Sequence, residues 1–579
     1  METKDAMNRW LVGIVVFLSI VLAVSVFKNI AYPLLWNDES ETAMYAKRIL
    51  QYGYPKVHDG KNVVYLLGLR DEIGIDKKTD AYLGSLWGQY YFAALGEMMA
   101  RTTRDIYLKT ALLRIPFALI GLLGIAILVL SVAPFFKIRK NDFLQFLALF
   151  ILLEILSVPI ALHLREVRYY SLAIFLVGCV LYLYHRRVYF EIPKTVMYVF
   201  AMLAALFALF FTFPPVYFSI IFTIGLYEVF RLFSKGAFKK AVWVCLPVFI
   251  SALIVIPLLS FFHTLMISRE FSKSLILTVS QRMDMAEKII YFLMTKEFLS
   301  IVLIVKVVAI FLWLHQKNMK NGVLTGGDNT AQIESNDDCA VSKMNEWQEI
   351  IQRFHVSNFL SLFCVIHLTL LLRMPMLIIY ERYYIILQPM MMMILLLDVF
   401  NIRALTNAIP VLASRRKLKV VFLSSLMLLL IFNGHGKMSL VKKHVFEIFH
   451  QYKGPLDYAI PFIQTKYKNP EKLIIATNYE ETSYMYYLDS KVIVGFVGNN
   501  LQEDMASDPD IIIPRTMWNP EATRSILGHF FQKGKYNQSI LPIANSLVNN
   551  IPQVSGPIQH AFKTILPEDE RQSLVIYYR

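Results

Sequence analysis

Repeated long apolar runs constrain the fold of this chain more than any other feature. Each run is near the ~20 residues that a helix needs to cross a ~30 Å hydrocarbon core. They lie at about 11–31, 112–133, 143–162, 169–185, 195–212, 215–231, 241–262, 289–313, 356–372, 376–400 and 419–434. Because 56% of the 579 residues are hydrophobic and only 17% are charged, the sequence predicts an integral polytopic membrane protein. We expect 11 transmembrane helices, or 12 or 13 if shorter segments also cross.

The basic residues indicate how these helices are oriented. If the N-terminus is cytoplasmic and the runs alternate, every compact basic cluster falls on the cytoplasmic side, as in Arg186-Arg187 and Arg415-Arg416-Lys417. The net charge of +15 is then a matter of topology, and we expect no nucleic acid partner. A polar loop at about 314–355 lies on the same side and is predicted to be partly disordered. We expect the protein in a bacterial inner (cytoplasmic) membrane.

One moderately apolar segment, 82–100, does not fit this alternation. An additional span there would invert every later loop, so the segment must lie along the interface or be re-entrant, unless a second short crossing compensates for it. It belongs to the first external loop, at about 32–110.

The composition changes after about residue 437. Long apolar runs give way to short β-rich segments at 472–477, 491–495, 510–513 and 574–577, which turn residues and helical stretches separate. We therefore predict a multi-helix membrane domain over 1–436 and an extracytoplasmic α/β domain over 437–579. The fold class is an α-helical polytopic membrane protein with a C-terminal α/β domain.

The first external loop begins with a dense acidic cluster, Asp38, Glu39 and Glu41. Carboxylates beside hydrocarbon are either solvated at the interface or kept for chemistry. Apolar residues recur after Glu39 at helical spacing, which predicts an amphipathic helix that ends at Gly53. The simplest structural role for Asp38 is the N-cap of this helix.

Four motifs, taken in order, resemble a known family. They are Asp38-Glu39 before a Tyr-Ala helix, the run Leu113-Arg114-Ile115-Pro116, the sequence Arg165-x-x-Arg168-Tyr169-Tyr170, and Glu381-Arg382-Tyr383 before a helix with a proline. Their order, spacing and common side resemble the group that includes ArnT and the dolichyl-phosphate-mannose protein mannosyltransferases. These are membrane glycosyltransferases of the GT-C superfamily. The resemblance covers most of the membrane part.

The resemblance implies a fold, an activity and partners. It implies a GT-C fold and an inverting glycosyltransferase that moves a hexose or pentose from a polyprenyl-phosphate donor. The acceptor would be extracytoplasmic: a lipid-linked glycan, a lipid A-type lipid, a polysaccharide or a protein hydroxyl. Membrane lipids are the other expected partners.

The resemblance also implies roles for individual residues. Asp38 is the expected general base and Glu39 the second choice. Arginine suits the departing phosphate because its planar fork binds two oxygens. The expected phosphate-binding residues are Arg382, Arg168, Arg165 and Lys78, although Lys77-Lys78-Thr79-Asp80 departs from the family's Lys-Pro-Pro-Leu. Glu41, which helical spacing turns away from Asp38 and Glu39, has a supporting or capping role. Tyr45 and Tyr383 are supporting residues.

Several alternatives stay open. The three arginines could be membrane anchors, and Arg114 is expected to be structural. The scattered histidines have no ligand spacing, so we expect no cofactor and no dedicated metal, although Asp38 with Glu39 could hold a divalent cation. A transporter or flippase of lipid-linked glycans is the second functional class, and a non-catalytic GT-C-like subunit is the third. Ionisable residues gathered at one rim, without an evident internal repeat, favour the transferase.

Overall fold

The computed structural model describes most of the chain. The described residues are 2–64, 74–136, 140–190, 195–235, 238–262, 279–325, 337–373, 381–408, 437–493, 501–515, 521–547, 560–568 and 573–579. Within them, nine helices are long and apolar enough to cross a membrane, or ten if one bent pair counts as a span. The protein is therefore an integral membrane protein, as predicted.

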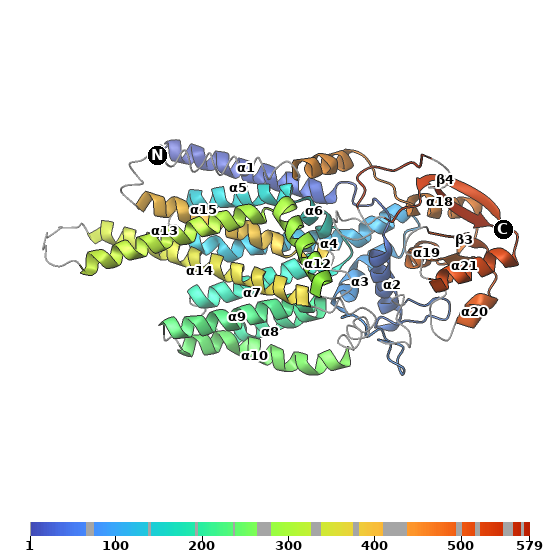
Figure 1. The fold of residues 1–579 in the computed structure, drawn as a ribbon, viewed down its shortest axis with the longest axis horizontal. Helices are drawn as coiled ribbons and strands as arrows, with labels where there is room; N and C mark the ends of the chain where they lie inside the picture. Colours follow the sequence, from blue (N-terminus) through green and yellow to red (C-terminus); the bar gives the residue numbers. More distant parts are fainter. Residues whose placement is uncertain are drawn as a thin grey trace.

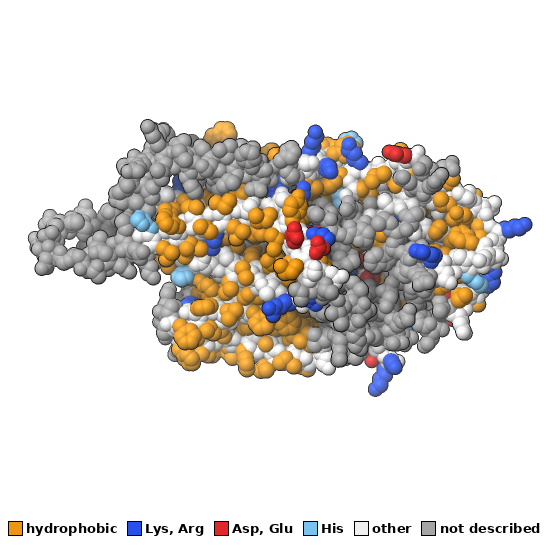
Figure 2. All heavy atoms as spheres, in the orientation of Figure 1, with side chains coloured by type: hydrophobic (Ala, Val, Ile, Leu, Met, Phe, Trp, Pro, Cys, Tyr) orange, Lys and Arg blue, Asp and Glu red, His pale blue; other side chains and the backbone are white. Residues whose placement is uncertain are grey.

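The spans form an elongated bundle beside the C-terminal domain (Figure 1). Their helices are α1 (Glu2–Phe27), α4 (Ile106–Val132), α5 (Lys140–Leu156), α6 (Val158–Leu164), α7 (Tyr169–Tyr189), α8 (Thr195–Thr212), α9 (Pro214–Lys235), α10 (Phe238–Phe261), α13 (Leu299–Thr325), α14 (Asp337–Arg373) and α15 (Leu387–Ala408). Exposed apolar side chains cover the visible flank of the bundle (Figure 2), where a bilayer would contact it. Trp10, Phe200 and Phe311 are examples that are more than half exposed.

The structure corrects several predicted boundaries. The run 143–162 is broken into α5 and α6, which meet at 83°. The run 289–313 is divided between α12 (Val279–Lys296) and α13, with Phe298 at a positive φ of 59° between them. Most of the predicted loop 314–355 is helical, because α13 continues to Thr325 and α14 begins at Asp337. The run 419–434 lies outside the described residues.

Charged residues also occur within the spans, so the expectation that they gather only at one rim is wrong. Lys306 of α13 and Asp398 of α15 form an ion pair of 3.3 Å, and the Asp398 side chain is fully buried. Lys306 also donates to the Ser357 hydroxyl of α14. A charge in this setting is stable only when it is paired, so this contact joins three helices of the bundle.

Two short helices lie between the bundle and the C-terminal domain (Figure 1). The first, α2 (Asn37–Tyr52), has acidic residues in its first turn, where the helix dipole favours them. Gly53 ends it at φ 85°, as predicted. The expected capping by Asp38 is wrong, because Trp36 is the N-cap residue and no side chain caps the helix. The second, α3 (Gly88–Ala100), has 13 residues, too few to cross a bilayer.

The C-terminal region contains a five-stranded sheet of order β2-β1-β3-β5-β4. Its strands are β1 (Ile474–Thr477), β2 (Lys491–Ile493), β3 (Ile511–Ile513), β4 (Asn537–Ala544) and β5 (Ser573–Tyr578). The first three are parallel, with Ile475 opposite both Val492 and Ile511, and β5 pairs antiparallel with β3 and β4. The helices are α18 (Leu456–Lys466), α19 (Glu481–Leu488), α20 (Leu501–Ala506) and α21 (Glu521–Lys533). Four strands match the predicted segments, and β4 was not predicted.

The α/β region and the first external loop share one hydrophobic core. Buried residues from 34–117, such as Tyr45 and Tyr90, belong to the same cluster as Tyr484, Ile511 and Ile576. A second cluster fills the helix bundle. Strand β2 lies on one side of β1 and β3 on the other, so the connections run to opposite sides of β1. At such a switch point a crevice opens at the carboxyl ends of the strands. The residues that follow β1 contact α2.

Candidate active site

The carboxylate of Asp38 lies between two arginines at the end of the bundle. Its Oδ2 is 3.2 Å from Nη2 of Arg382 and 3.6 Å from Nη2 of Arg168. The Asp38 side chain is 19% exposed, so the group is reachable from outside. Arg168 also donates to the backbone oxygen of Asp38 and to the Thr42 hydroxyl. The structure thus brings together three residues that are distant in the sequence.

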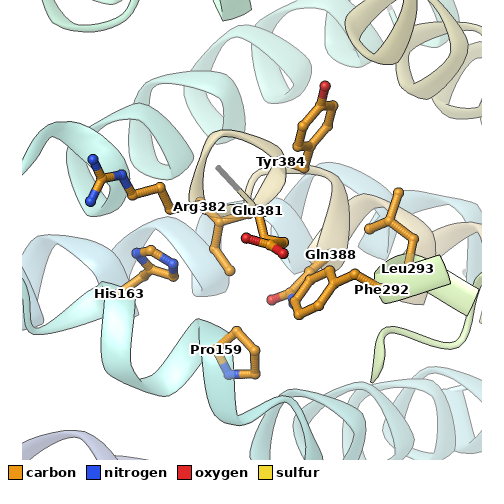
Figure 3. Close-up of a pocket in the computed structure, with 9 residues that line it drawn as sticks. Pro159, His163, Phe292, Leu293, Glu381, Arg382, Tyr384 and Gln388 are labelled. Carbon is orange, nitrogen blue, oxygen red and sulfur yellow. The ribbon is translucent and has the colours of Figure 1, made fainter. Parts of the chain in front are cut away.

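Arg382 is held by aromatic rings. It belongs to a 3₁₀ turn, η3 (Glu381–Tyr384). Its guanidinium carbon is 5.2 Å from the ring centre of Trp36 and 5.7 Å from that of Tyr383, which is cation–π distance. Figure 3 shows the guanidinium extending past His163 and away from the Glu381 carboxylate. The hollow between these side chains is too narrow for a water molecule, so the base of the site is closely packed.

Glu166 contacts both Trp36 and His163 beside the two arginines. Its carboxylate accepts a hydrogen bond of 3.0 Å from Trp36 Nε1 and lies 3.2 Å from His163 Nδ1. Burial and the charge of Glu39 raise the pKa of Glu166 to about 8, although Arg382 and Arg168 oppose the shift. The raised pKa means that Glu166 offsets the charge of the two arginines less than a freely solvated carboxylate would.

Glu39 projects from α2 about 100° away from Asp38, toward Arg114 and the backbone of Val167. It is fully buried and forms a two-pronged contact with Arg114, at 2.9 Å to Nε and 2.5 Å to Nη2. Glu39 also accepts from the backbone N–H of Val167, while Arg114 donates to the carbonyl oxygens of Ile30 and Pro33. This contact fixes the first turn of α2 against α4 and the Arg168 loop. Arg114 is fully buried in this contact, which suits the structural role expected for it.

Other predicted residues lie in separate contacts. Arg165 pairs with Glu447 at 2.6 Å, and Glu447 also contacts His560 at 2.7 Å. Tyr45 is buried and donates to the carbonyl oxygen of Val64 at 2.6 Å. Lys78 is exposed in a turn. Among the described residues, neither Arg165 nor Lys78 takes part in the ion pairs of Asp38.

Glu41 lies on the Asp38 side of α2, contrary to the predicted orientation. It is partly exposed, and the Tyr90 hydroxyl donates to its Oε1 at 3.5 Å. Burial raises the pKa of Glu41 to about 7; the Asp38 charge adds to the shift and the Arg168 charge opposes it. The two acids are three positions apart and share a helix face.

The C-terminal domain contributes a wall to the site. The Ser40 hydroxyl is 2.7 Å from that of Thr482 and accepts from Ser483 at 2.9 Å, although Ser40 and Thr482 are 442 positions apart. The charge of Asp38 is among the causes that raise the pKa of Tyr479, after burial and Glu480. Arg515, at the end of β3, pairs with Glu480 at the end of β1. The switch point of the sheet therefore faces α2.

Side chains that bind metals do not gather into a cluster in the described part of the chain. Within the described ranges, no group of three or more histidine, cysteine, aspartate or glutamate side chains could hold a metal ion. At the candidate site, the cationic side chains of Arg168 and Arg382 surround the carboxylate of Asp38. Such a site can bind an anion and stabilise negative charge that develops on it.

Sequence reasoning did not assign roles to Trp36, His163, Glu166, Tyr90 and Glu481. Trp36 and Glu166 stand beside residues that were selected, and their proximity in the sequence was the available signal. Tyr90 lies in the segment whose placement was uncertain. Nothing in the sequence indicated that the stretch after β1 would reach α2, because that contact depends on the sheet order.

Comparison with known proteins finds similarity to solved structures but not to known sequences. No family model matches the sequence, and no curated protein matches it. Two solved structures of the Archaeoglobus fulgidus oligosaccharyltransferase are similar, one in the apo form and one tethered by a disulfide to an acceptor peptide with an NVT sequon. Each is 12% identical, over 92% of this chain and 69% of that chain, with TM-scores of 0.42 and 0.43 respectively. Similarity at this level does not establish a family, and the proposals below rest on the site.

Proposed function

We propose that the protein is an inverting GT-C glycosyltransferase. It transfers a hexose or pentose from a polyprenyl-phosphate donor to an extracytoplasmic glycan, lipid or protein hydroxyl. The observation that carries the proposal is Asp38 held between Arg168 and Arg382 at the end of the bundle, partly exposed and beside the α/β wall. The order of the family-like motifs supports it, because three of the four supply these residues.

The charge balance of the site suits a sugar linked through one phosphate. Two guanidinium groups meet the single carboxylate of Asp38, so positive charge exceeds negative charge in this contact. A polyprenyl-phosphate sugar carries one negative charge, and a second develops as the sugar leaves. Arginine forks at this position stabilise the growing charge on the phosphate. Asp38 orients the acceptor and holds the two arginines.

The location of the site agrees with a lipid donor. The apolar flank of the bundle lies beside the α2–α3 layer, so a polyprenyl chain can remain in the bilayer while its phosphate reaches Arg168 and Arg382. With the N-terminus in the cytoplasm, this layer and the C-terminal domain lie outside the cell membrane.

A donor panel tests the function. Full-length protein in nanodiscs is incubated with radiolabelled polyprenyl-phosphate mannose, glucose, galactose and arabinose, with and without a membrane glycolipid extract. We expect transfer from one donor, or slow sugar release to water without acceptor. Asp38→Asn should reduce turnover by 10²-fold or more, and Arg382→Lys by a smaller factor, since lysine keeps the charge without the fork.

The same assay separates the competing functions. The matched control is Arg104→Gln, which changes an exposed charge in the same external loop outside the ion pairs of Asp38. Unchanged turnover in Asp38→Asn contradicts the assigned role of Asp38. Absence of transfer from every donor contradicts the transferase and favours a non-catalytic subunit. Donor translocation across sealed vesicles without sugar transfer favours the flippase, for which the buried Lys306–Asp398 pair is the relevant observation.

A further inference from the structure

In the proposed reaction the acceptor hydroxyl loses a proton, and a group near Asp38 must receive it. Oδ2 of Asp38 already faces two guanidinium groups, so this carboxylate is occupied by charge pairing. Glu41 lies one turn further along α2 and on the same side. It is partly exposed, as a proton acceptor must be. The Tyr90 hydroxyl donates to it in a long hydrogen bond of 3.5 Å.

A second buried carboxylate lies in the C-terminal domain at the start of the helix that docks on α2 at Ser40, the residue before Glu41. Glu481 begins α19, the helix whose next residues, Thr482 and Ser483, bond to Ser40 of α2. Its side chain is buried, and its Oε2 has no hydrogen-bond partner. Burial raises the pKa of Glu481 to about 7, and the charges of Glu41 and Glu480 add to the shift. A buried carboxyl oxygen without a hydrogen-bond partner is stable when the carboxyl is protonated, and docking of α19 at Ser40 brings this carboxyl to the part of α2 that carries Glu41.

We propose that Glu41, paired across the domain interface with Glu481, is the general base of the transfer reaction, while Asp38 anchors the two arginines. This inference rests on the proposed function. As the acceptor oxygen attacks the anomeric carbon, its proton moves to the carboxylate of Glu41. The bond between that carbon and the phosphate oxygen breaks, and its electron pair stays on the phosphate, which faces Arg168 and Arg382. Atoms and charges balance without any further reactant.

The groups around Glu41 determine its response to pH. On α2 they are Asp38 and Tyr45; on α3, Tyr90; in the loop before α7, Arg168; and on α19, Glu481. A pKa of about 7 matches the operating range expected of a general base. Because the base acts in its ionised form, turnover rises with pH as Glu41 loses its proton. An acidic limb near pH 7 is therefore expected.

The proposal also gives the C-terminal domain a chemical role. Glu481 reaches Glu41 only when α19 is docked on α2, so the base is complete only in the assembled molecule. Removing the Glu481 charge should make Glu41 easier to ionise, since one source of repulsion is lost. Glu481→Gln should then shift the acidic limb of turnover to lower pH and keep the enzyme active.

The test uses full-length protein in nanodiscs with the polyprenyl-phosphate sugar that the wild type turns over in the donor panel. Glu41→Gln should lower turnover at neutral pH by about 10²-fold or more, and Glu41→Asp should restore part of it with a shifted acidic limb. The matched control is Glu97→Gln on α3. Glu97 is also a buried carboxyl at the domain interface, where it accepts from Tyr486 at 2.6 Å, so this variant should keep wild-type turnover.

An infrared titration gives a second reading that does not need activity. A protonated-carboxyl band that titrates near pH 7 should be present in the wild type and in Glu97→Gln, and reduced in Glu41→Gln. Turnover of Glu41→Gln equal to the wild type overturns the inference and leaves the proposed function standing. The inference is also overturned if the acidic limb of the pH dependence of turnover stays at its wild-type position in Glu41→Asp and in Glu481→Gln. Absence of donor turnover by the wild type counts against the proposed function itself.

Discussion

The acidic residues at the start of α2 differ in their contacts, because they project from different sides of the helix. Glu39 is directed inward, where Arg114 takes up both of its oxygens. Asp38 is directed outward, where Arg168 and Arg382 meet it. Neighbours in the sequence therefore differ in their contacts: Glu39 fixes the helix in the interior, and Asp38 meets two arginines at a partly exposed position. Helical rotation of about 100° per residue is sufficient to produce this difference.

Glu447 gives a residue-scale prediction about stability and pH. Burial would raise its pKa, but the charges of His560 and Arg165 outweigh burial and lower the pKa to about 2. A carboxyl with a depressed folded-state pKa stabilises the fold above its unfolded pKa, and that contribution is lost as the pH falls toward 2. The shift corresponds to about 3 kcal/mol. Glu447→Gln should therefore be less stable at neutral pH and lose less further stability on acidification.

The measurement is thermal unfolding in detergent between pH 7 and pH 3. Asp489→Asn is the control, because Asp489 makes an exposed surface ion pair with Lys47, and such pairs contribute little. Parallel pH curves for the wild type and Glu447→Gln would contradict the prediction.

Much of the site at this scale was accessible from the sequence, and the rest was not. The selection of Asp38, Arg168 and Arg382 followed from motif order, and the structure places these three together. The expectation that Glu41 faces away from Asp38 failed, because three residues turn a helix by about 300°, which leaves the two side chains only about 60° apart. The pairing of Arg165 with Glu447 joins distant parts of the chain, and no local pattern encodes it.

At the scale of elements, breaks in helices position the site. The 83° bend between α5 and α6 turns the chain toward His163 and Glu166. The 3₁₀ turn η3 directly before α15 presents Arg382. Apolar runs in the sequence located the spans well, since burial in hydrocarbon needs length and hydropathy. They did not locate the bends, because a bent pair and a straight span have the same composition.

The buried ion pair between Lys306 of α13 and Asp398 of α15 gives a prediction about how these two helices are held together. Removing one partner leaves an uncompensated charge in the bundle, so Lys306→Met or Asp398→Leu alone should destabilise the protein by about 3–5 kcal/mol. The double substitution should recover most of that loss, because two apolar side chains replace two charges. Thermal unfolding of the four proteins in one detergent measures the coupling. Additive losses would contradict it.

At the scale of the whole molecule, the membrane domain and the C-terminal domain are joined by a common core. Residues from 34–117 and 456–576 belong to one buried cluster, and hydroxyl contacts join α2 to α19. The change in composition near residue 437 marked where the chain changes its type of structure. It could not show that the two parts share an interior, because composition does not report contacts between distant segments.

The shared core predicts the effect of truncation. A chain that ends after Gln451 should keep the helix bundle but lose the packing of α2 and α3, so proteases should cleave between 37 and 64 from the outside. Coexpression of the separate fragment 452–579 should restore part of the protection. Protease protection in sealed vesicles, with the intact chain as control, measures this effect. Equal protection of the truncated and intact chains would contradict it.

The position of β5 bears on when a newly made molecule becomes active. This strand, residues 573–578, lies between β3 and β4 and pairs with both, so the sheet that carries α19 cannot close before it arrives. During synthesis Asp38 is made long before that strand, and Arg168 and Arg382 follow it in the chain. Until β5 is made, these charged residues lack the wall that α19 forms. The surroundings of Asp38 are therefore complete only when nearly all of the 579 residues have left the ribosome.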